Sequence, residues 1–464
     1  MSNTLRIVPL GGGPGVVTSN MFVYEWGNEA VIIDCGIGFP DDKVSDDILI
    51  PDVNYLKSRG LKIHGVVLTH GHDDHMAALP HILPQIGFPP VFGSSLTAGF
   101  ATDRLENFDI KHKIAVFKES DRLQLGPFTI DPVFVTHSVP DSFHLAIGTP
   151  LGMVYHGSDF KFDLTPVDGR RPNFTKMVKV AQNGVLCLLS DSLRSERPGF
   201  TQSESTLTTA IDRELRNCPG RMIFTTMSSQ IHRIQQAIDV AYQHGRQVVF
   251  IGRSMERNVA TAQRLGFLKL SKKQVLNSKG FSRLPDHQLL IIIAGSQGQE
   301  SSSLTRYAGG VHKLLKIQPT DKVIYSTDII PGNEQAVYQV IDQLTKQNLS
   351  VVYSDVADDL HVSGHASAGE MQLLMELINP QYLYPIGGSF RHMKRYQELA
   401  LGQGYRTDQV IMPKTAQVVE FDSSGHYHLG EILAIKPVRL NQNSSYNKGY
   451  GKKKKFKGQK KASF

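Results

Sequence analysis

The chain has 464 residues, of which 40% are hydrophobic and 20% are charged. This composition excludes a disordered or fibrous protein and is typical of a globular one. The length exceeds that of one typical core and predicts two or three domains. No apolar run approaches the roughly 18 residues needed to cross a bilayer, and no basic segment followed by an apolar one opens the chain. We therefore expect neither a membrane span nor a secretory signal.

The formal net charge of +7 comes from the C-terminal segment. Lys448 to Phe464 contains eight lysines and no acidic residue, so subtracting these eight charges leaves −1 for the rest of the chain. We expect residues 438–464 to form a disordered lysine-rich tail, because such a composition cannot offset its ordering entropy. Two roles fit the tail: a solubilising segment, or a tether for a polyanion.

The cysteines indicate the compartment. Cys35, Cys187 and Cys218 are widely spaced and too few for a disulfide framework. A reducing, cytoplasmic location follows from this usage.

The first part of the chain predicts strands separated by turns. Residues 5–15 have the pattern of a strand that enters a glycine-rich turn, and residues 21–36 that of a hairpin. A further strand is expected at 64–70 and a short helix at 76–83. Between residues 92 and 168, β-branched runs alternate with Gly and Pro turns, as in antiparallel strands.

The pattern changes at Thr201. The sequence "TQSE" has the form of a helix-capping box, with Thr201 three residues before Glu204. Strand and helix patterns then alternate over residues 206–355, which is typical of a parallel sheet covered on both faces. Residues 356–437 return to a strand at "HVSGH", a helix and a strand. We therefore predict one domain formed by residues 1–205 and 356–437, with residues 206–355 inserted in it as a second domain.

Four potential metal ligands crowd the end of the strand at 64–70. They are His70, His72, Asp74 and His75, in the sequence "HGHDDH". Imidazole nitrogens and carboxylate oxygens are ligands that zinc accepts, and manganese accepts similar ones. Two histidines two residues apart can face one ion from an extended segment, while Asp74 and His75 face a second. The spacing therefore suits a dinuclear centre, and the alternative is a polar loop that happens to be rich in histidine.

Further candidate ligands follow other strands. His137 in "FVTHSVPDSF" and Asp159 in "VYHGSDF" each come after a strand pattern. Taken alone, such residues are more often hydrogen-bonded polar groups than ligands. An aspartate between two ions can bridge them, which favours a ligand role for Asp159. Asp34, at the end of "VIID", is either the residue that orients a ligating imidazole or a turn aspartate.

Six segments resemble the metallo-β-lactamase fold in its β-CASP branch, and within it the ribonuclease J family. In chain order they are "LTHGHDDH", "THSVPDSF", "SDFKFDLTPVDG", "LLSDSLRSERPGFTQSE", "AGSQGQE" and "HVSGHA". The resemblance runs from about Leu5 to Pro437. It implies an α/β architecture: a metallo-β-lactamase αββα sandwich with an inserted β-CASP α/β domain. It also implies a two-zinc phosphodiesterase that cuts RNA internally and degrades it from the 5′ end.

The resemblance further implies roles for individual residues. One zinc is held by His70, His72 and His137, the other by Asp74 and His75, and Asp159 lies between them. His365 contacts the scissile phosphate and protonates the leaving oxygen, with Ser363 and Gly364 in the phosphate-binding segment. In the inserted domain, Ser229 lies near the 5′ end of the substrate. Ser363 and Ser229 have a plainer alternative, in which their hydroxyls cap turns.

The chain departs from the family's pattern at the second zinc. Where the family reads P-V-H-G-E, this chain reads "PIGGS", with Gly387 in place of a ligating histidine and Ser389 in place of the glutamate. Glycine coordinates nothing, so we expect a weaker second site, and His392 is the nearest alternative imidazole. The family also has a C-terminal domain that supports dimers and tetramers; the lysine-rich tail stands in its place.

Three functions remain open at this point. The first is a zinc-dependent ribonuclease acting on RNA as a homodimer or homotetramer. The second is a weakly active or inactive RNA-binding subunit that forms a hetero-oligomer with an active paralogue, which Gly387 favours. The third is a small-molecule hydrolase or a DNA-directed β-CASP nuclease on the same fold.

Overall fold

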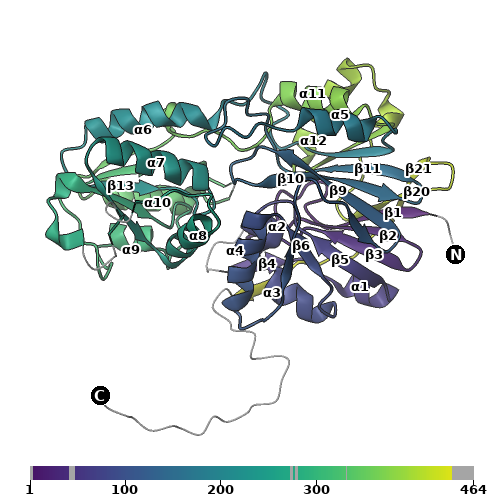
Figure 1. Cartoon of the computed structure of the whole chain (residues 1–464), viewed down its shortest axis with the longest axis horizontal. Helices are drawn as coiled ribbons and strands as arrows, with labels where there is room; N and C mark the ends of the chain where they lie inside the picture. The colour runs from purple at the N-terminus through teal and green to yellow at the C-terminus, as the bar shows by residue number, and fades with distance from the viewer. Residues whose placement is uncertain (1–3, 41–46, 272–274, 277–280, 331, 442–464) are drawn as a thin grey trace, which may run out of the picture.

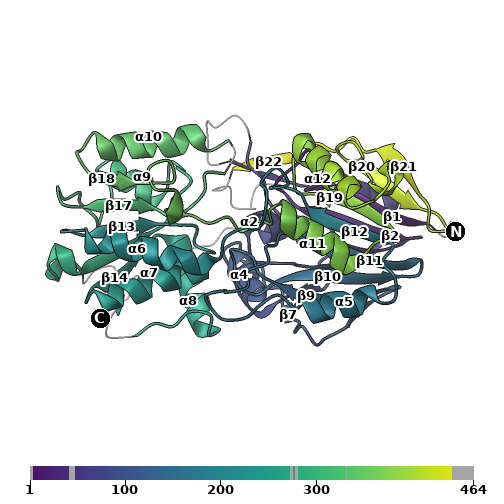
Figure 2. The same cartoon turned by 90° about the horizontal axis from the view of Figure 1, so that it is seen from above.

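The computed structural model describes residues 4–40, 47–271, 275–276, 281–330 and 332–441. They form two lobes, shown in Figure 1 and, from above, in Figure 2. The larger lobe is a sandwich of two sheets with helices on both outer faces, and the smaller lobe is a single sheet between helices. The sequence-based prediction of the fold is thereby confirmed.

The first sheet of the sandwich has eight strands in the order β21-β20-β1-β2-β3-β5-β6-β7. Their bounds are β1 Leu5–Gly11, β2 Met21–Trp26, β3 Glu29–Ile33, β5 Lys62–Val67, β6 Val91–Gly93, β7 Ile114–Val116, β20 Gln417–Phe421 and β21 Tyr427–Ile432. The helices on its outer face are α1 Asn54–Arg59, α2 Asp73–Met76, α3 Leu79–Ile82 and α4 Ser95–Glu106. Figure 1 shows α1 and α3 below the sheet.

The second sheet has six strands in the order β19-β12-β11-β10-β9-β8. Their bounds are β8 Leu123–Leu125, β9 Phe128–Val135, β10 Ser142–Thr149, β11 Gly152–Gly157, β12 Cys187–Asp191 and β19 Tyr382–Ile386. Its outer face is covered by α5 Phe174–Ala181, α11 Ala368–Ile378 and α12 Phe390–Gly402 (Figure 1).

Alternation of apolar side chains explains why these two sheets face each other. In β1, Leu5 and Ile7 point into the core between the sheets, where they join Phe128 and Leu145. Val8, which points the other way, belongs to the core under α3 and α4. Because successive side chains of a strand point to opposite faces, an apolar strand with both faces covered becomes the middle of a layered sandwich.

The smaller lobe is built around a parallel sheet of six strands in the order β15-β14-β16-β13-β17-β18. The strands are β13 Met222–Thr225, β14 Gln247–Ile251, β15 Val275–Leu276, β16 Leu289–Ile293, β17 Lys322–Tyr325 and β18 Ser350–Val352. The helices are α6 Leu207–Arg216, α7 Ile231–Gln243 and α8 Arg253–Arg264 on one face, and α9 Ser303–Ala308 and α10 Glu334–Thr345 on the other. All five side chains of β16 are buried, as expected for a parallel strand covered on both sides.

The two lobes contact each other where α8 packs on α4. Thr261 of α8 donates a hydrogen bond of 2.5 Å to Asp103 of α4. A side chain added at Gly99 of α4 would lie 2.8 Å from Leu265 and Thr261, so the helices approach closely.

Short elements complete the fold. The 3-10 helices are η1 Leu83–Gln85, η2 Glu204–Thr206, η3 Phe281–Arg283, η4 Asp286–Gln288, η5 Asp358–Leu360 and η6 Thr407–Gln409. A small antiparallel sheet pairs β4, Asp47–Ile50, with β22, Val438–Asn441. The expectation that the disordered tail begins at residue 438 was therefore wrong for the first four residues, which find a partner strand. The lysines from Lys448 onwards lie outside the described residues.

Three local predictions from the sequence were also wrong. The helix expected at 76–83 is interrupted, and α2 begins earlier, so that Asp74 and His75 lie on a helical turn. Thr201 caps no helix: Ser203 caps η2, and the Thr201 hydroxyl bonds to the carbonyl of His365 instead. "HVSGH" forms no strand: it ends in a bend at Gly364 and His365, and side chains bind four of its five carbonyl groups.

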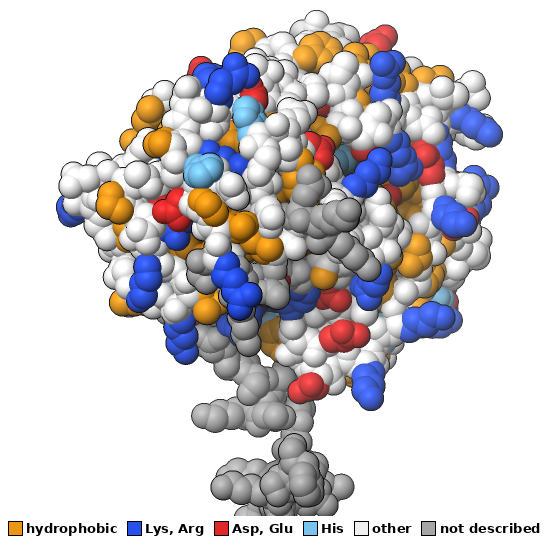
Figure 3. All heavy atoms as spheres, turned by 60° about the vertical axis from the view of Figure 1, so that its left-hand side comes forward, with side chains coloured by type: hydrophobic (Ala, Val, Ile, Leu, Met, Phe, Trp, Pro, Cys, Tyr) orange, Lys and Arg blue, Asp and Glu red, His pale blue; other side chains and the backbone are white. Residues whose placement is uncertain are grey.

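Charged side chains are mixed on the face of the smaller lobe that Figure 3 brings forward. Lys and Arg side chains lie scattered there among acidic and apolar ones. This distribution agrees with the near-neutral charge of the chain outside its lysine-rich end. None of the helices in the described ranges is long and apolar enough to cross a membrane.

Candidate metal centre

Candidate ligands from four separate elements meet at one edge of the sandwich. His70 and His72 follow β5, and α2 carries Asp74 and His75. His137 follows β9, and Asp159 follows β11. Within each of two groups, ligand atoms lie within 4.8 Å of one another. The strand ends thus bring together all six residues that the sequence singled out as ligands.

The first group consists of His70, His72, His137 and Asp159. His137 Nε2 lies 3.1 Å from His72 Nδ1 and 3.8 Å from Asp159 Oδ2. Burial lowers the pKa of His72 to about 3 and holds the pKa values of His70 and His137 well below their ordinary value. Among the described residues, the buried Nε2 of His70 has no hydrogen-bond partner. Neutral imidazoles whose nitrogens converge on a carboxylate suit a divalent cation.

The second group consists of Asp74, His75 and the shared Asp159. His75 Nε2 lies 3.4 Å from Asp159 Oδ2 and 3.6 Å from Asp74 Oδ2. On the other side of the ring, His75 Nδ1 donates a 2.7 Å hydrogen bond to Asp34 Oδ2. Asp34 is 1% exposed and also accepts bonds from the backbone and hydroxyl of Thr69. Asp34 therefore fixes the direction in which His75 presents its Nε2.

A third set of titratable side chains adjoins both groups. His365 Nδ1 donates a 2.7 Å hydrogen bond to Asp191 Oδ2, and His365 Nε2 lies 4.0 Å from Asp159 Oδ2. Burial opposes the charged imidazole, but the carboxylates of Asp191 and Asp159 outweigh it and raise the pKa of His365 to about 9. The histidine is therefore placed to give a proton to a group bound beside Asp159.

Gly387 occupies the position where a further ligand would be expected. Its φ is +67°, and a side chain added there would meet Asp191 Oδ1 at 3.6 Å, so the position faces this cluster. His392 does not fill the gap, because its ring is held by Ser389 at the start of α12 and its Nε2 lies 3.6 Å from Glu196. The second group therefore offers three ligand residues where the first offers four.

The segment that carries His365 approaches the ligands very closely. The carbonyl of Gly364 accepts a 2.7 Å hydrogen bond from His137 Nδ1. A side chain at Gly364 would lie 2.8 Å from the His137 ring and from Ser138, so glycine is required by this approach. The Ser363 hydroxyl accepts the backbone N–H of His365, which is the turn-capping role considered as the alternative. Ser229 lies apart from the cluster, in the turn between β13 and α7.

Two residues of the site were missed by reasoning from the sequence. Asp191 ends β12, and Asn20 follows the glycine-rich turn and places its Nδ2 2.9 Å from His75 Nε2. Asp191 could have been found from the sequence, because it ends an apolar strand, and Asp34 and Asp159 follow closely after the ends of theirs. No local sequence pattern marks Asn20, since only the fold brings residue 20 close to residue 75.

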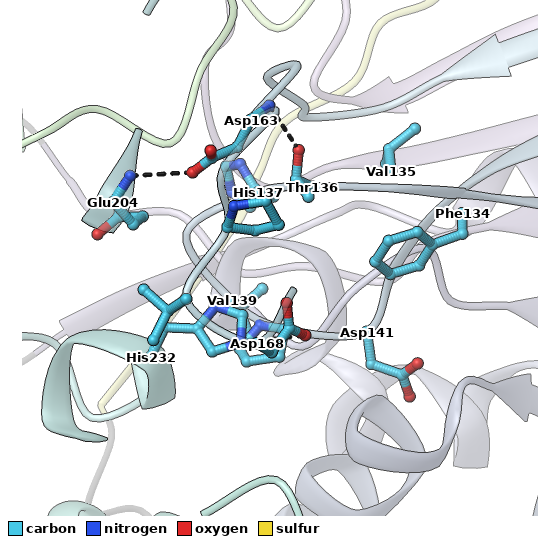
Figure 4. A pocket seen from close by; sticks show the side chains of 13 residues that line it. Phe134, Val135, Thr136, His137, Val139, Asp141, Asp163, Asp168, Glu204 and His232 are labelled. Atoms are coloured by element: carbon cyan, nitrogen blue, oxygen red, sulfur yellow. Dashed lines mark hydrogen bonds and ion pairs between the residues drawn. The ribbon is translucent and has the colours of Figure 1, made fainter. Parts of the chain in front are cut away.

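A small pocket adjoins the cluster on the side of the inserted lobe (Figure 4). His137, Thr136 and Glu204 contribute from residues 1–205, and His232 contributes from the inserted lobe. His232 Nε2 lies 3.4 Å from Asp168 across the pocket. The candidate metal centre is thus bordered by both lobes.

Comparison with known protein families agrees with this architecture. A model of the metallo-beta-lactamase superfamily matches residues 14–157, and one of the ribonuclease J beta-CASP domain matches residues 219–344. A model of the Zn-dependent metallo-hydrolase RNA specificity domain matches residues 351–413. Ribonuclease J of Thermus thermophilus is 38% identical over 437 residues, which cover 92% of this chain and 76% of that protein.

The chain belongs to the ribonuclease J family. Ribonuclease J of Helicobacter pylori is 36% identical over 95% of this chain but only 64% of its own length, so the chain spans about two thirds of such relatives. Among solved structures, a protein of unknown function from Enterococcus faecalis has the same fold, with a TM-score of 0.62 and 14% identity. That likeness covers 91% of this chain and 100% of the other.

Proposed function

We propose that this member of the ribonuclease J family is a metal-dependent ribonuclease that hydrolyses phosphodiester bonds of RNA. The observation that carries the proposal is the convergence of six ligand residues with His365, whose Nε2 lies 4.0 Å from the shared Asp159. The relatives that match this chain over most of its length are named ribonuclease J, which supports RNA as the substrate. Both endonucleolytic and 5′-to-3′ exonucleolytic cutting belong to the proposal.

Each residue has a task in the proposed reaction. His70, His72, His137 and Asp159 would hold one cation, and Asp74, His75 and Asp159 would hold another. A divalent cation bound here would supply Lewis-acid activation and neutralise negative charge on the phosphodiester. Asp191 orients His365, which gives its proton to the departing 3′ oxygen. Ser363 and Gly364 contribute backbone to the phosphate-binding segment, and Ser229 lies toward the 5′ end of the substrate.

Zinc is the proposed metal, because three imidazoles and a carboxylate suit it. We expect one tightly bound ion in the four-ligand group and a second, weaker one in the three-ligand group. Removal of a supporting partner of a ligand typically weakens metal affinity about 10–100-fold, and a missing ligand should cost at least as much.

A second candidate function is an RNA-binding subunit with weak or no activity, paired with an active paralogue. Gly387 favours it, because it leaves the second group one ligand short. A DNA-directed nuclease is the third candidate. Matched single-stranded RNA and DNA of one sequence separate these functions: the proposal requires cleavage of RNA, faster than that of DNA.

The decisive experiment incubates the purified protein with end-labelled RNA carrying a 5′ monophosphate or triphosphate, with and without chelator. We expect metal-dependent products, and Asp74→Ala or His75→Ala should abolish them. Asp73→Ala is the matched control, since Asp73 lies on the same turn but is exposed and belongs to neither ligand group. Unchanged cleavage by the Asp74 and His75 variants, in protein of verified metal content, contradicts the assignment.

Three further proposals concern the domain boundaries, the cellular compartment and the oligomeric state. We propose domain boundaries at 1–205, 206–355 and 356–437. The three buried free cysteines support a reducing, cytoplasmic setting. Homodimers, homotetramers and hetero-oligomers with a paralogue are the proposed assemblies, and size-exclusion chromatography with light scattering distinguishes them.

A further inference from the structure

The chain returns from the inserted lobe to the sandwich through the segment Leu360–His365. Leu360 ends η5, His361 is extended, and Gly364 and His365 form a bend, so the segment belongs to no sheet. Five of its six carbonyl groups each accept a hydrogen bond from a side chain of a different element. These five hydrogen bonds connect the backbone of the segment to side chains of both lobes.

The inserted lobe holds the first half of this segment. The Ser326 hydroxyl, at the end of β17, donates a 2.7 Å bond to the Leu360 carbonyl. Arg233 of α7 donates a 3.0 Å bond to the Val362 carbonyl and another of 3.0 Å to His361 Nδ1. Arg233 also donates to the Ser326 carbonyl at 2.8 Å, so the two residues form one unit.

The sandwich holds the second half. Lys161, two residues after Asp159, donates a 3.2 Å bond to the Ser363 carbonyl. His137 binds the Gly364 carbonyl at 2.7 Å, and Thr201 binds the His365 carbonyl at 2.7 Å. The backbone that leads to His365 is therefore held by the inserted lobe at its start and by the sandwich at its end.

Glu204 joins the two halves. Its carboxylate accepts bonds of 3.0 and 3.1 Å from Arg233 and one of 3.3 Å from Lys161. The side chains of Arg233, Lys161 and Glu204 are 1%, 0% and 4% exposed, so none of them is available to contact a polymer in solvent. Their function is internal to the protein.

We propose that Arg233 and Ser326 are positioning residues of the inserted lobe that set the placement of His365 at the metal centre. The inference rests on the proposed nuclease function. A shift of the inserted lobe moves the Leu360 and Val362 carbonyls directly, and with them the imidazole three to five residues further on. Engagement of RNA by the inserted lobe is thereby linked to the geometry of proton transfer.

The first test compares Ser326→Ala with Thr225→Val. Thr225 is the matched control, because its buried hydroxyl donates a 3.0 Å bond to the Ile293 carbonyl within the same lobe and does not touch the segment.

Rates are measured on RNA and on bis-p-nitrophenyl phosphate, a phosphodiester too small to need binding by the inserted lobe. We expect Ser326→Ala to lower kcat on RNA about tenfold or more, since small misplacements of a catalytic group cost up to about 100-fold. The rate on bis-p-nitrophenyl phosphate should change much less, because p-nitrophenolate leaves without a proton and does not need His365 as an acid. KM for RNA and metal content should stay within about twofold of wild type, and Thr225→Val should behave as wild type. A change confined to KM, or a kcat on RNA equal to that of Thr225→Val, overturns the proposal.

A second test compares Arg233→Lys with Arg221→Lys. Lysine keeps the charge but lacks the fork that bonds several acceptors at once. Arg221 also forms a buried fork with its own partner, Asp321, away from the segment. Hydrogen–deuterium exchange of peptides covering residues 360–367 should accelerate in Arg233→Lys and Ser326→Ala only, while the peptide with His70 to His75 stays unchanged. Exchange equal to that of the controls refutes the positioning role. A wild-type protein that cleaves neither substrate contradicts the proposed function instead, and the exchange comparison still decides this inference.

Discussion

Gly387→His should strengthen binding of the second cation. The left-handed φ of +67° costs a non-glycine residue about 1–2 kcal/mol of folding stability, but nothing except Asp191 Oδ1, at 3.6 Å, lies near the added Cβ. The added Cβ therefore fits beside Asp191, which shares a cluster with Asp159 of the three-ligand group. One added ligand should raise affinity at least about 10–100-fold, or about 1.4–2.7 kcal/mol.

The assay is a titration of metal-free protein with zinc in competition with a chromophoric chelator. Wild type should show one tight and one weaker equivalent, and Gly387→His two tight ones. Gly27→His is the control, because Gly27 has a φ of +65° and open space around it in the turn between β2 and β3. The reasoning is refuted if wild type already takes up two equivalents with equal affinity, or if the curve of Gly387→His coincides with those of wild type and Gly27→His.

Three further predictions follow from the site, its surroundings and the charge distribution. Asp34→Asn should weaken the second cation about tenfold or more by loosening His75, and the same zinc titration measures it; an unchanged second equivalent contradicts that role. Burial opposes the charge on Glu204, but Arg233 and Lys161 lower its pKa from 4.5 to about 2. A carboxyl group whose pKa is lowered by folding stabilises the fold at pH values above its ordinary pKa, and this effect is lost as the pH falls toward 2. Glu204→Gln should therefore reduce the free energy of unfolding by about 3 kcal/mol at neutral pH and by progressively less below pH ~4.5. Denaturant unfolding of the metal-free proteins at several pH values tests this, and a pH-independent difference rules it out. Deletion of Lys448 to Phe464 should weaken RNA binding and flatten its dependence on salt; an unaltered log-log slope means that the segment does not touch RNA.

The buried ion pairs of Glu204 with Arg233 and Lys161 show why local sequence patterns did not predict the role of Glu204. Glu204 lies where a capping box was expected, yet its carboxylate serves two cations that are 29 and 43 residues away in sequence. A glutamate near a helix start is usually exposed, and only tertiary packing reveals a partner in another domain.

The sequence by itself predicted the alternation of strands and helices and the cluster of candidate ligands, and its resemblance to a known family implied the layered architecture. Periodic burial of apolar residues is a local property, so β1 to β3 and the parallel strands β13, β14, β16 and β17 were visible as patterns. The spacing of His70, His72, Asp74 and His75 was visible for the same reason, because all four residues lie within one strand end and the next turn. The absence of a side chain at Gly387 also followed directly from the residue type.

Only the tertiary structure decided how distant residues meet. Asn20, Asp191 and Thr201 acquire their partners across long stretches of chain, through contacts that no local pattern encodes. The segment at His361–His365 had the composition of a strand, but the side chains of Arg233, Lys161 and His137 occupy the carbonyl groups that a neighbouring strand would bind. Backbone groups bond to whichever donor the fold brings nearest, and that choice is made by packing rather than by propensity.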